Sequence, residues 1–65
     1  MPVERYHLTL AAGGRAVLQG RWASETTARR KFSGWIGEYG NLPGVRITLV
    51  DEETGETLTT WPKES

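Results

Sequence analysis

The chain has 65 residues, of which 37% are hydrophobic, eight are Lys or Arg, eight are Asp or Glu and none is Cys. A chain of this length buries only about 60% of the surface of its unfolded form, which supports one small core. The lack of cysteine excludes disulfides and thiolate metal sites, so hydrophobic packing or self-association must supply the stability. We therefore expect one domain over residues 1–65.

No segment has the apolar character of a secretory signal or approaches the roughly 18 apolar residues of a membrane span. We expect a soluble, cytoplasmic protein with no membrane partner. The composition, which is rich in Gly, Arg, Thr and Glu, is typical of a bacterial or phage protein from a high-GC genome.

The charge is balanced in total but unequal along the chain. Residues 1–46 carry seven basic and three acidic residues, whereas residues 47–65 carry one basic and five acidic residues. Proteins that bind nucleic acid without sequence specificity are usually basic overall, because they neutralise phosphates. The zero total therefore counts against that class, although one basic face remains compatible with it.

The first half of the chain predicts a β-hairpin. Residues 5–11 alternate apolar and polar, with Tyr6, Leu8 and Leu10 on one face, which is the pattern of a half-buried strand. Two glycines then supply a tight turn, and the alternation resumes over residues 15–22.

A helix is predicted over residues 25–39. Ser24 is a good N-cap, and Gly40 with Asn41 favours a left-handed end. One apolar stripe at helical spacing is formed by Ala28, Phe32, Trp35, Ile36 and Tyr39.

A second hairpin follows, with strands at about 45–51 and 56–61 joined by a short turn that contains Gly55. The order is ββαββ. Four strands and one amphipathic helix predict an α+β two-layer sandwich, in which the helix covers one face of a four-stranded sheet.

This arrangement resembles the immunoglobulin-binding domain of protein G, a β-grasp-like fold of similar length. The resemblance rests on the Tyr6-Leu8-Leu10 alternation and on the helix register of Ala28, Phe32 and Trp35. It implies a sheet whose first and fourth strands are parallel neighbours at the centre. Antibody binding is not implied, because no specific motif supports it.

The sequence offers little for catalysis, a metal or a cofactor, and we expect no enzyme. His7 is the only candidate base, no cysteine is available as a nucleophile, and His7 is expected to be solvated or paired across strands. The acidic residues of the second hairpin do not have the spacing of a calcium loop, so we expect a solvated turn.

The sheet face opposite the helix is the first candidate interaction surface. Alternation places there His7, Thr9, Val17, Gln19, Arg21, Arg46, Thr48, Val50, Thr57, Thr59 and Trp61. The residues singled out for contact are Val17, Arg21, Arg46, Thr48, Val50, Thr59 and Trp61. Two alternatives stay open for Trp61: it forms a patch with Val17 and Val50, or a bulge near Thr60 lets it fold round the sheet edge into the core.

The outer face of the helix is the second candidate surface, and it carries Arg30, Ser33, Gly34 and Gly37. Each glycine inside a helix costs up to about 1 kcal/mol relative to alanine. Either another backbone approaches this face closely, or the glycines are tolerated drift.

We therefore expect a small non-catalytic interaction or regulatory module that acts through one of these faces and self-associates as a homodimer. The alternative is a small nucleic-acid-binding protein, whose phosphate contacts would come from Arg21, Arg29, Arg30, Lys31 and Arg46.

Overall fold

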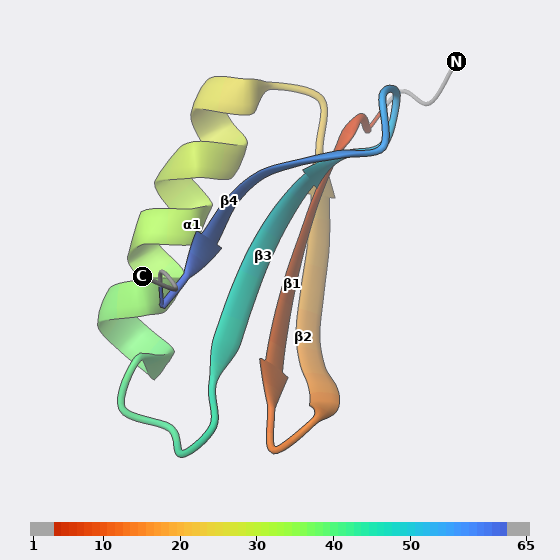
Figure 1. Cartoon of the computed structure of the whole chain (residues 1–65). Helices are drawn as coiled ribbons and strands as arrows, with labels where there is room; N and C mark the ends of the chain where they lie inside the picture. Colours follow the sequence, from red (N-terminus) through yellow and green to blue (C-terminus); the bar gives the residue numbers. More distant parts are fainter. Residues whose placement is uncertain (1–3, 63–65) are drawn as a thin grey trace.

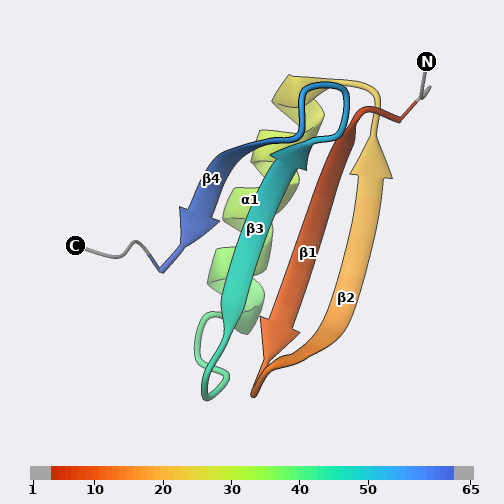
Figure 2. The ribbon, with the colours of Figure 1, turned by 45° about the vertical axis from the view of Figure 1, so that its right-hand side comes forward.

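The computed structural model describes residues 4–62 and has the predicted ββαββ order (Figure 1). The elements are β1 (Tyr6–Ala12), β2 (Arg15–Trp22), α1 (Glu25–Tyr39), β3 (Arg46–Asp51) and β4 (Glu56–Trp61). The strands form one sheet, and α1 lies against one of its faces, so the α+β two-layer fold is confirmed (Figure 2). No helix within residues 4–62 has the length and apolar character needed to cross a bilayer.

The strand order is β2-β1-β3-β4, and every neighbouring pair is antiparallel. The order implied by the resemblance to protein G is therefore wrong, because β3 and not β4 lies beside β1. A central strand has a neighbouring strand on each side. This position suits the strand whose face toward the helix is the more apolar. Ile47 and Leu49 of β3 are fully buried, whereas β4 is rich in threonine and lies at the edge.

The core lies between the two central strands and the helix. Leu8 and Leu10 of β1 and Ile47 and Leu49 of β3 have no exposed surface. Ala28 of α1 is also fully buried, because a small side chain lets the helix approach the sheet closely. The rest of the predicted stripe is half-buried and packs around this core, and its members are Phe32, Trp35, Ile36 and Tyr39.

The two helix ends differ in how well the sequence predicts them. Ser24 caps the N-terminus as predicted, since its Oγ accepts a hydrogen bond of 3.3 Å from the Thr27 N–H. The predicted left-handed C-terminal end is wrong: Gly40 stays right-handed, with φ of −59°, and its N–H donates to the Ile36 carbonyl at 2.9 Å. The positive φ of +66° falls instead at Gly44, where a Cβ would lie 3.2 Å from the backbone nitrogen of Gly13. The close approach of these two loops explains why glycine is needed there.

Gly20 makes room for a pair of tryptophan rings on the helix side of β2. A Cβ at Gly20 would collide with the indole of Trp22. That ring meets Trp35 of the helix edge to face, with ring centroids 6.2 Å apart and an interplanar angle of 72°. Both tryptophans pack against the core, and Trp35 does so as part of the predicted helix stripe.

We expect Gly20→Ala to lower the free energy of unfolding by about 1–3 kcal/mol, because the added methyl displaces Trp22 from its contact with Trp35. The matched control is Gly34→Ala on the outer face of α1, where a Cβ meets nothing within 4 Å. That variant should be stabilised by about 0.5–1 kcal/mol, because alanine has the higher helix propensity. Urea unfolding measures both values, and equal effects of the two substitutions would contradict the packing of Trp22 over Gly20.

Candidate interaction surface

The sheet face opposite α1 is open, and its residues follow from the strand register. Residues directly opposite one another in an antiparallel pair project to the same face. The open sheet face, a name kept below, consists of His7, Thr9, Ala11, Ala16, Val17, Gln19, Arg21, Arg46, Thr48, Val50, Thr57 and Thr60. Val17 lies at an irregularity of β2, where the register leaves it unpaired, and it is 56% exposed.

An uncharged row crosses the middle of this face. Gln19 lies opposite Thr9, Thr9 opposite Thr48, and Thr48 opposite Thr60, so each strand contributes one residue. The three threonines are half-buried by their neighbours. Each threonine presents both a methyl group and a hydroxyl, so the row can make apolar contacts and hydrogen bonds.

A charged cluster lies at one end of the open sheet face. Arg21 Nε donates to Glu52 Oε1 at 2.8 Å, and Glu52 Oε2 lies 3.9 Å from His7 Nδ1. The hydrogen bond from Arg21 is the main reason that the pKa of Glu52 is below its usual value and that the pKa of Arg21 is raised. Because the two charges are paired, Arg21 adds no unbalanced charge to the face.

His7 is paired across strands, which is one of the roles that the sequence predicts for it. Its Nε2 lies 3.0 Å from Gln19 Oε1 on β2 and 3.4 Å from Thr9 Oγ1. These contacts connect the charged cluster with the uncharged row.

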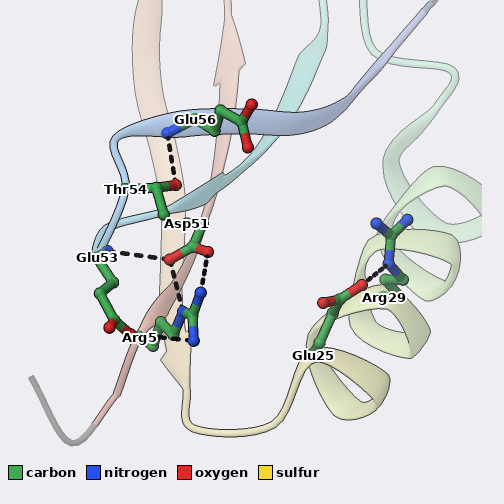
Figure 3. A network of polar contacts seen from close by, with 7 residues as sticks. All are labelled: Arg5, Glu25, Arg29, Asp51, Glu53, Thr54 and Glu56. Carbon is green, nitrogen blue, oxygen red and sulfur yellow. Dashed lines mark hydrogen bonds and ion pairs between the residues drawn. The ribbon is translucent and has the colours of Figure 1, made fainter.

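Arg5, which precedes β1, binds the acidic turn that follows β3 (Figure 3). Arg5 donates to both carboxylate oxygens of Asp51, at 2.7 and 2.6 Å, and its third nitrogen lies 3.0 Å from Glu53. Asp51 is only 5% exposed and also accepts a hydrogen bond from the Glu53 N–H at 3.0 Å. The bonds from Arg5 are the main cause of the lowered pKa of Asp51.

These pairs change the interpretation of the acidic turn. Arg5 pairs with Asp51 and Glu53, and Arg21 pairs with Glu52. These three carboxylates therefore take part in contacts of the fold and are not simply solvated, as the sequence predicts for the turn. Within residues 4–62, no group of three or more His, Cys, Asp or Glu side chains is arranged to hold a metal ion.

Thr59 is not on the open sheet face, so its predicted placement there is wrong, and Trp61, for which the sequence leaves two alternatives open, is not on that face either. The register passes from Leu49 opposite Thr59 to Val50 opposite Thr57, which leaves Leu58 unpaired in a bulge. An extra residue reverses the alternation beyond it, so Thr59 and Trp61 turn toward the helix side and Thr60 takes the open position.

The structure thus settles the two alternatives for Trp61. The side chain packs against the core, and its ring would lie 3.1 Å from a Cβ at Gly40. It lies on the opposite face of the sheet from Val50, so the expected patch of Val17, Val50 and Trp61 does not form. The bulge that turns it inward lies at Leu58, two residues before the expected position.

The outer face of α1 is exposed, as the apolar stripe predicts. Arg30, Ser33, Gly34 and Gly37 are all exposed. Open space surrounds both glycines, with no atom within 4 Å of a Cβ built on either of them.

The basic residues of the nucleic-acid alternative lie in two separate layers. Arg21 and Arg46 belong to the open sheet face, whereas Arg29, Arg30 and Lys31 belong to the helix that covers the other face. Arg29 is also paired with Glu25 at 2.7 Å on the helix surface (Figure 3). The fold therefore does not bring the five basic side chains together.

The predicted site residues do not include Thr9, Gln19 and Thr60 of the uncharged row, although the sequence places the first two on this face. The bulge that turns Thr60 outward lies at Leu58, and the sequence offers a bulge in this strand only as one of two alternatives. Glu52 and Arg5 act through contacts between distant segments, for which the unequal charge of the two parts of the chain is the only sequence signal.

Comparison with protein-family models, curated proteins and solved structures finds no match for this chain.

The paired carboxylates predict a specific pH dependence of stability. Asp51 and Glu52 have lowered pKa values in the folded protein, so their pairs stabilise it above the unfolded-state pKa, near 4. This stabilisation is lost as the pH falls from about 4 through the folded pKa.

Asp51→Asn should therefore be less stable than the wild type at pH 7, and the difference should shrink in acid, as measured by urea unfolding at pH 7 and pH 3. Glu56→Gln, an exposed position in the same hairpin, is the control and should have little effect. Equal losses of stability in the two variants at pH 7 would refute a stabilising role for the Arg5–Asp51 pair.

Proposed function

We propose that this chain is a small non-catalytic interaction module that binds a protein through its open sheet face. The observation that carries the proposal is the uncharged row of Gln19, Thr9, Thr48 and Thr60 across all four strands. The central parts of protein interfaces are depleted in charged residues, because burying an unpaired charge is costly. A row without charge can be desolvated at lower cost.

The surroundings of the row also support this surface. Val50 and Ala11 add half-buried apolar area beside it, and Val17 adds an exposed apolar side chain. The ion pair between Arg21 and Glu52 on this face is already formed within the chain. A partner therefore does not have to supply a charge to neutralise Arg21 or Glu52.

The outer face of α1 offers a narrower surface. Its exposed residues are Arg30, Ser33, Gly34 and Gly37, of which the two glycines add no side-chain area. We accordingly place the interaction on the sheet and use the helix face as the control surface.

Site-specific cross-linking tests this proposal, because the chain contains no cysteine and any introduced thiol is unique. A benzophenone group attached to Thr48→Cys, at the centre of the open sheet face, is expected to form defined covalent protein adducts in an extract of cells that express the chain. Ser33→Cys, labelled in the same way on the outer face of α1, is the matched control and should give few adducts. Excess unlabelled wild type should abolish the adducts by competition.

Adducts of equal yield from the two positions, or adducts from Ser33→Cys alone, would contradict the proposal. Mass spectrometry identifies each adduct and so separates a contact with a second copy of the chain from a contact with a different protein.

The nucleic-acid alternative has a separate test. Because the basic residues are divided between two layers, we expect no saturable binding of labelled 20-nucleotide single-stranded or duplex DNA below about 100 µM protein at low salt. Fluorescence anisotropy measures this. Tight binding that weakens steeply with salt and is lost in the double variant Arg30→Ala, Lys31→Ala would favour the alternative.

A further inference from the structure

We infer that the outer edge of β2 pairs antiparallel with the same edge of a second copy of this chain, which joins the two sheets into one continuous sheet. This edge is distinct from the open sheet face, so the inference goes beyond the proposed function and does not depend on it. Its support comes from the backbone at the edge and from side chains that complement one another about Gly20.

Strand β2 is an edge strand, and its outer side can accept another strand. The strand order is β2-β1-β3-β4, so within residues 4–62 only one side of β2 has a neighbouring strand. An edge strand directs the N–H and C=O groups of alternate residues away from the sheet, and a second extended backbone is the group that matches them. The chemistry of the edge therefore specifies an extended strand as its occupant.

The β2 edge segment, a name kept below, consists of residues 18–22. These five residues stay in regular register with β1, opposite residues 10–6. The other edge of the sheet is less regular, because the bulge at Leu58 divides the paired residues of β4 into groups of two and three. Pro62, which follows β4, has no N–H to donate. Bulges and prolines hinder pairing at an edge, so β2 offers the better edge for a further strand.

Gly20 is the centre of the β2 edge segment. The segment begins after the irregularity at Val17 and ends with the strand at Trp22, so two residues lie on each side of Gly20. Two identical antiparallel strands are related by a two-fold axis through a residue pair, because opposite residues project to the same face. An axis at Arg21 would set two guanidinium groups opposite each other, and an axis at Gln19 would set the irregular Val17 opposite Arg21. An axis at Gly20 pairs all five residues of both copies.

On the helix side, the axis at Gly20 brings apolar groups together. Leu18 lies opposite Trp22 of the other copy, and both side chains are half-buried, so each has surface left to bury. The Trp22 indole occupies the Cβ position of Gly20. Because opposite Cβ positions are about 5 Å apart, the two indoles also approach each other at the axis.

On the side of the open sheet face, the axis at Gly20 sets Gln19 opposite Arg21 of the other copy. A hollow of about 350 Å³ is lined there by Glu4, Gln19, Gly20 and Arg21. Nε of Arg21 is bonded to Glu52, and the terminal nitrogens carry the other N–H donors. These donors and the Glu4 carboxylate suit a side-chain amide, which both accepts and donates, and Gln19 of the other copy supplies one.

The pairing also avoids like-charge contact along its length. Arg21 is the only charged residue of the β2 edge segment, and its opposite residue is neutral. Like charges directly opposite one another destabilise a strand pair, and apolar and hydrogen-bonded pairs stabilise it. The side chains of the segment are therefore complementary to a second copy of the same segment, and this complementarity selects the second copy as the occupant.

Sedimentation velocity from about 10 µM to 1 mM protein tests the dimer. A contact of one strand pair belongs to the weak class of interfaces, so the wild type is expected to pass from the 7.2 kDa monomer toward twice that mass, with a dissociation constant on the order of 100 µM. Gln19→Arg sets guanidinium groups opposite each other at both symmetric positions. It should raise the dissociation constant at least about tenfold.

Thr60→Arg and Thr48→Arg are the matched controls. They add the same charge to the other edge strand and to the centre of the open sheet face, respectively. Both should leave the dissociation constant unchanged, because neither residue lies at the edge of β2.

Disulfide trapping tests the register, since the chain contains no cysteine of its own. In an equimolar mixture of Gln19→Cys and Arg21→Cys, the axis at Gly20 sets the two thiols opposite each other with Cα atoms about 5 Å apart, which a disulfide spans. Two copies of either variant would have these atoms about 8 Å apart, which is beyond that span. Mild oxidation should therefore give the mixed disulfide in excess of random pairing.

A wild type that stays monomeric at 1 mM would overturn the inferred dimer, as would an unchanged dissociation constant for Gln19→Arg. Homodisulfides that equal or exceed the mixed product would refute the axis at Gly20. Weakening by Thr48→Arg or Thr60→Arg as large as that by Gln19→Arg would refute pairing through the edge of β2. The proposed function fails separately: edge pairing leaves Thr48 uncovered, so a lack of Thr48→Cys adducts would refute the proposed function alone.

Discussion

The antiparallel pairing of β1 with β3 is the contact on which the rest of this structure depends. Across it, Leu8 lies opposite Leu49 and Leu10 opposite Ile47, and all four side chains are fully buried. Because these strands form the centre of the sheet, β2 and β4 become its edges and the helix packs over the middle. The same pairing places Thr9 beside Thr48 at the centre of the opposite face.

The unequal charge of the two parts of the chain is used within the fold. Arg5 and Arg21 come from the basic part, and they bind Asp51 and Glu52 at the acidic turn. Since the Glu52 N–H also donates to the Arg5 carbonyl at 2.9 Å, main-chain and side-chain contacts hold the same two segments together. Part of the balanced charge is therefore used in pairs within the fold.

A single helix covers only one face of a four-stranded sheet, so the other face must tolerate water. Threonine suits this position, because it favours extended backbone and carries a hydroxyl beside its methyl group. The open sheet face can therefore remain hydrated in a monomer and still be desolvated on contact. The threonines therefore suit both an exposed sheet face and the protein contact that we propose for it.

The sequence by itself determined the elements, the half-buried face of the first strand, the helix stripe and the exposure of the outer helix residues. These features follow from periodicity and capping, which depend on residues within a few positions of one another. The open face was also largely predictable, since alternation identified its members on the first three strands except Ala11 and Ala16.

Only the tertiary structure decided the order of the strands, the partners of Arg5 and the face on which Trp61 lies. Strand order depends on which distant segments pair, and several orders satisfy the same alternation. The unpaired Leu58 reverses the alternation after it, and whether a strand bulges depends on its neighbour as much as on its own residues. Long-range pairing therefore assigned Thr60 to the open face and Trp61 to the core, a choice that local pattern left undetermined.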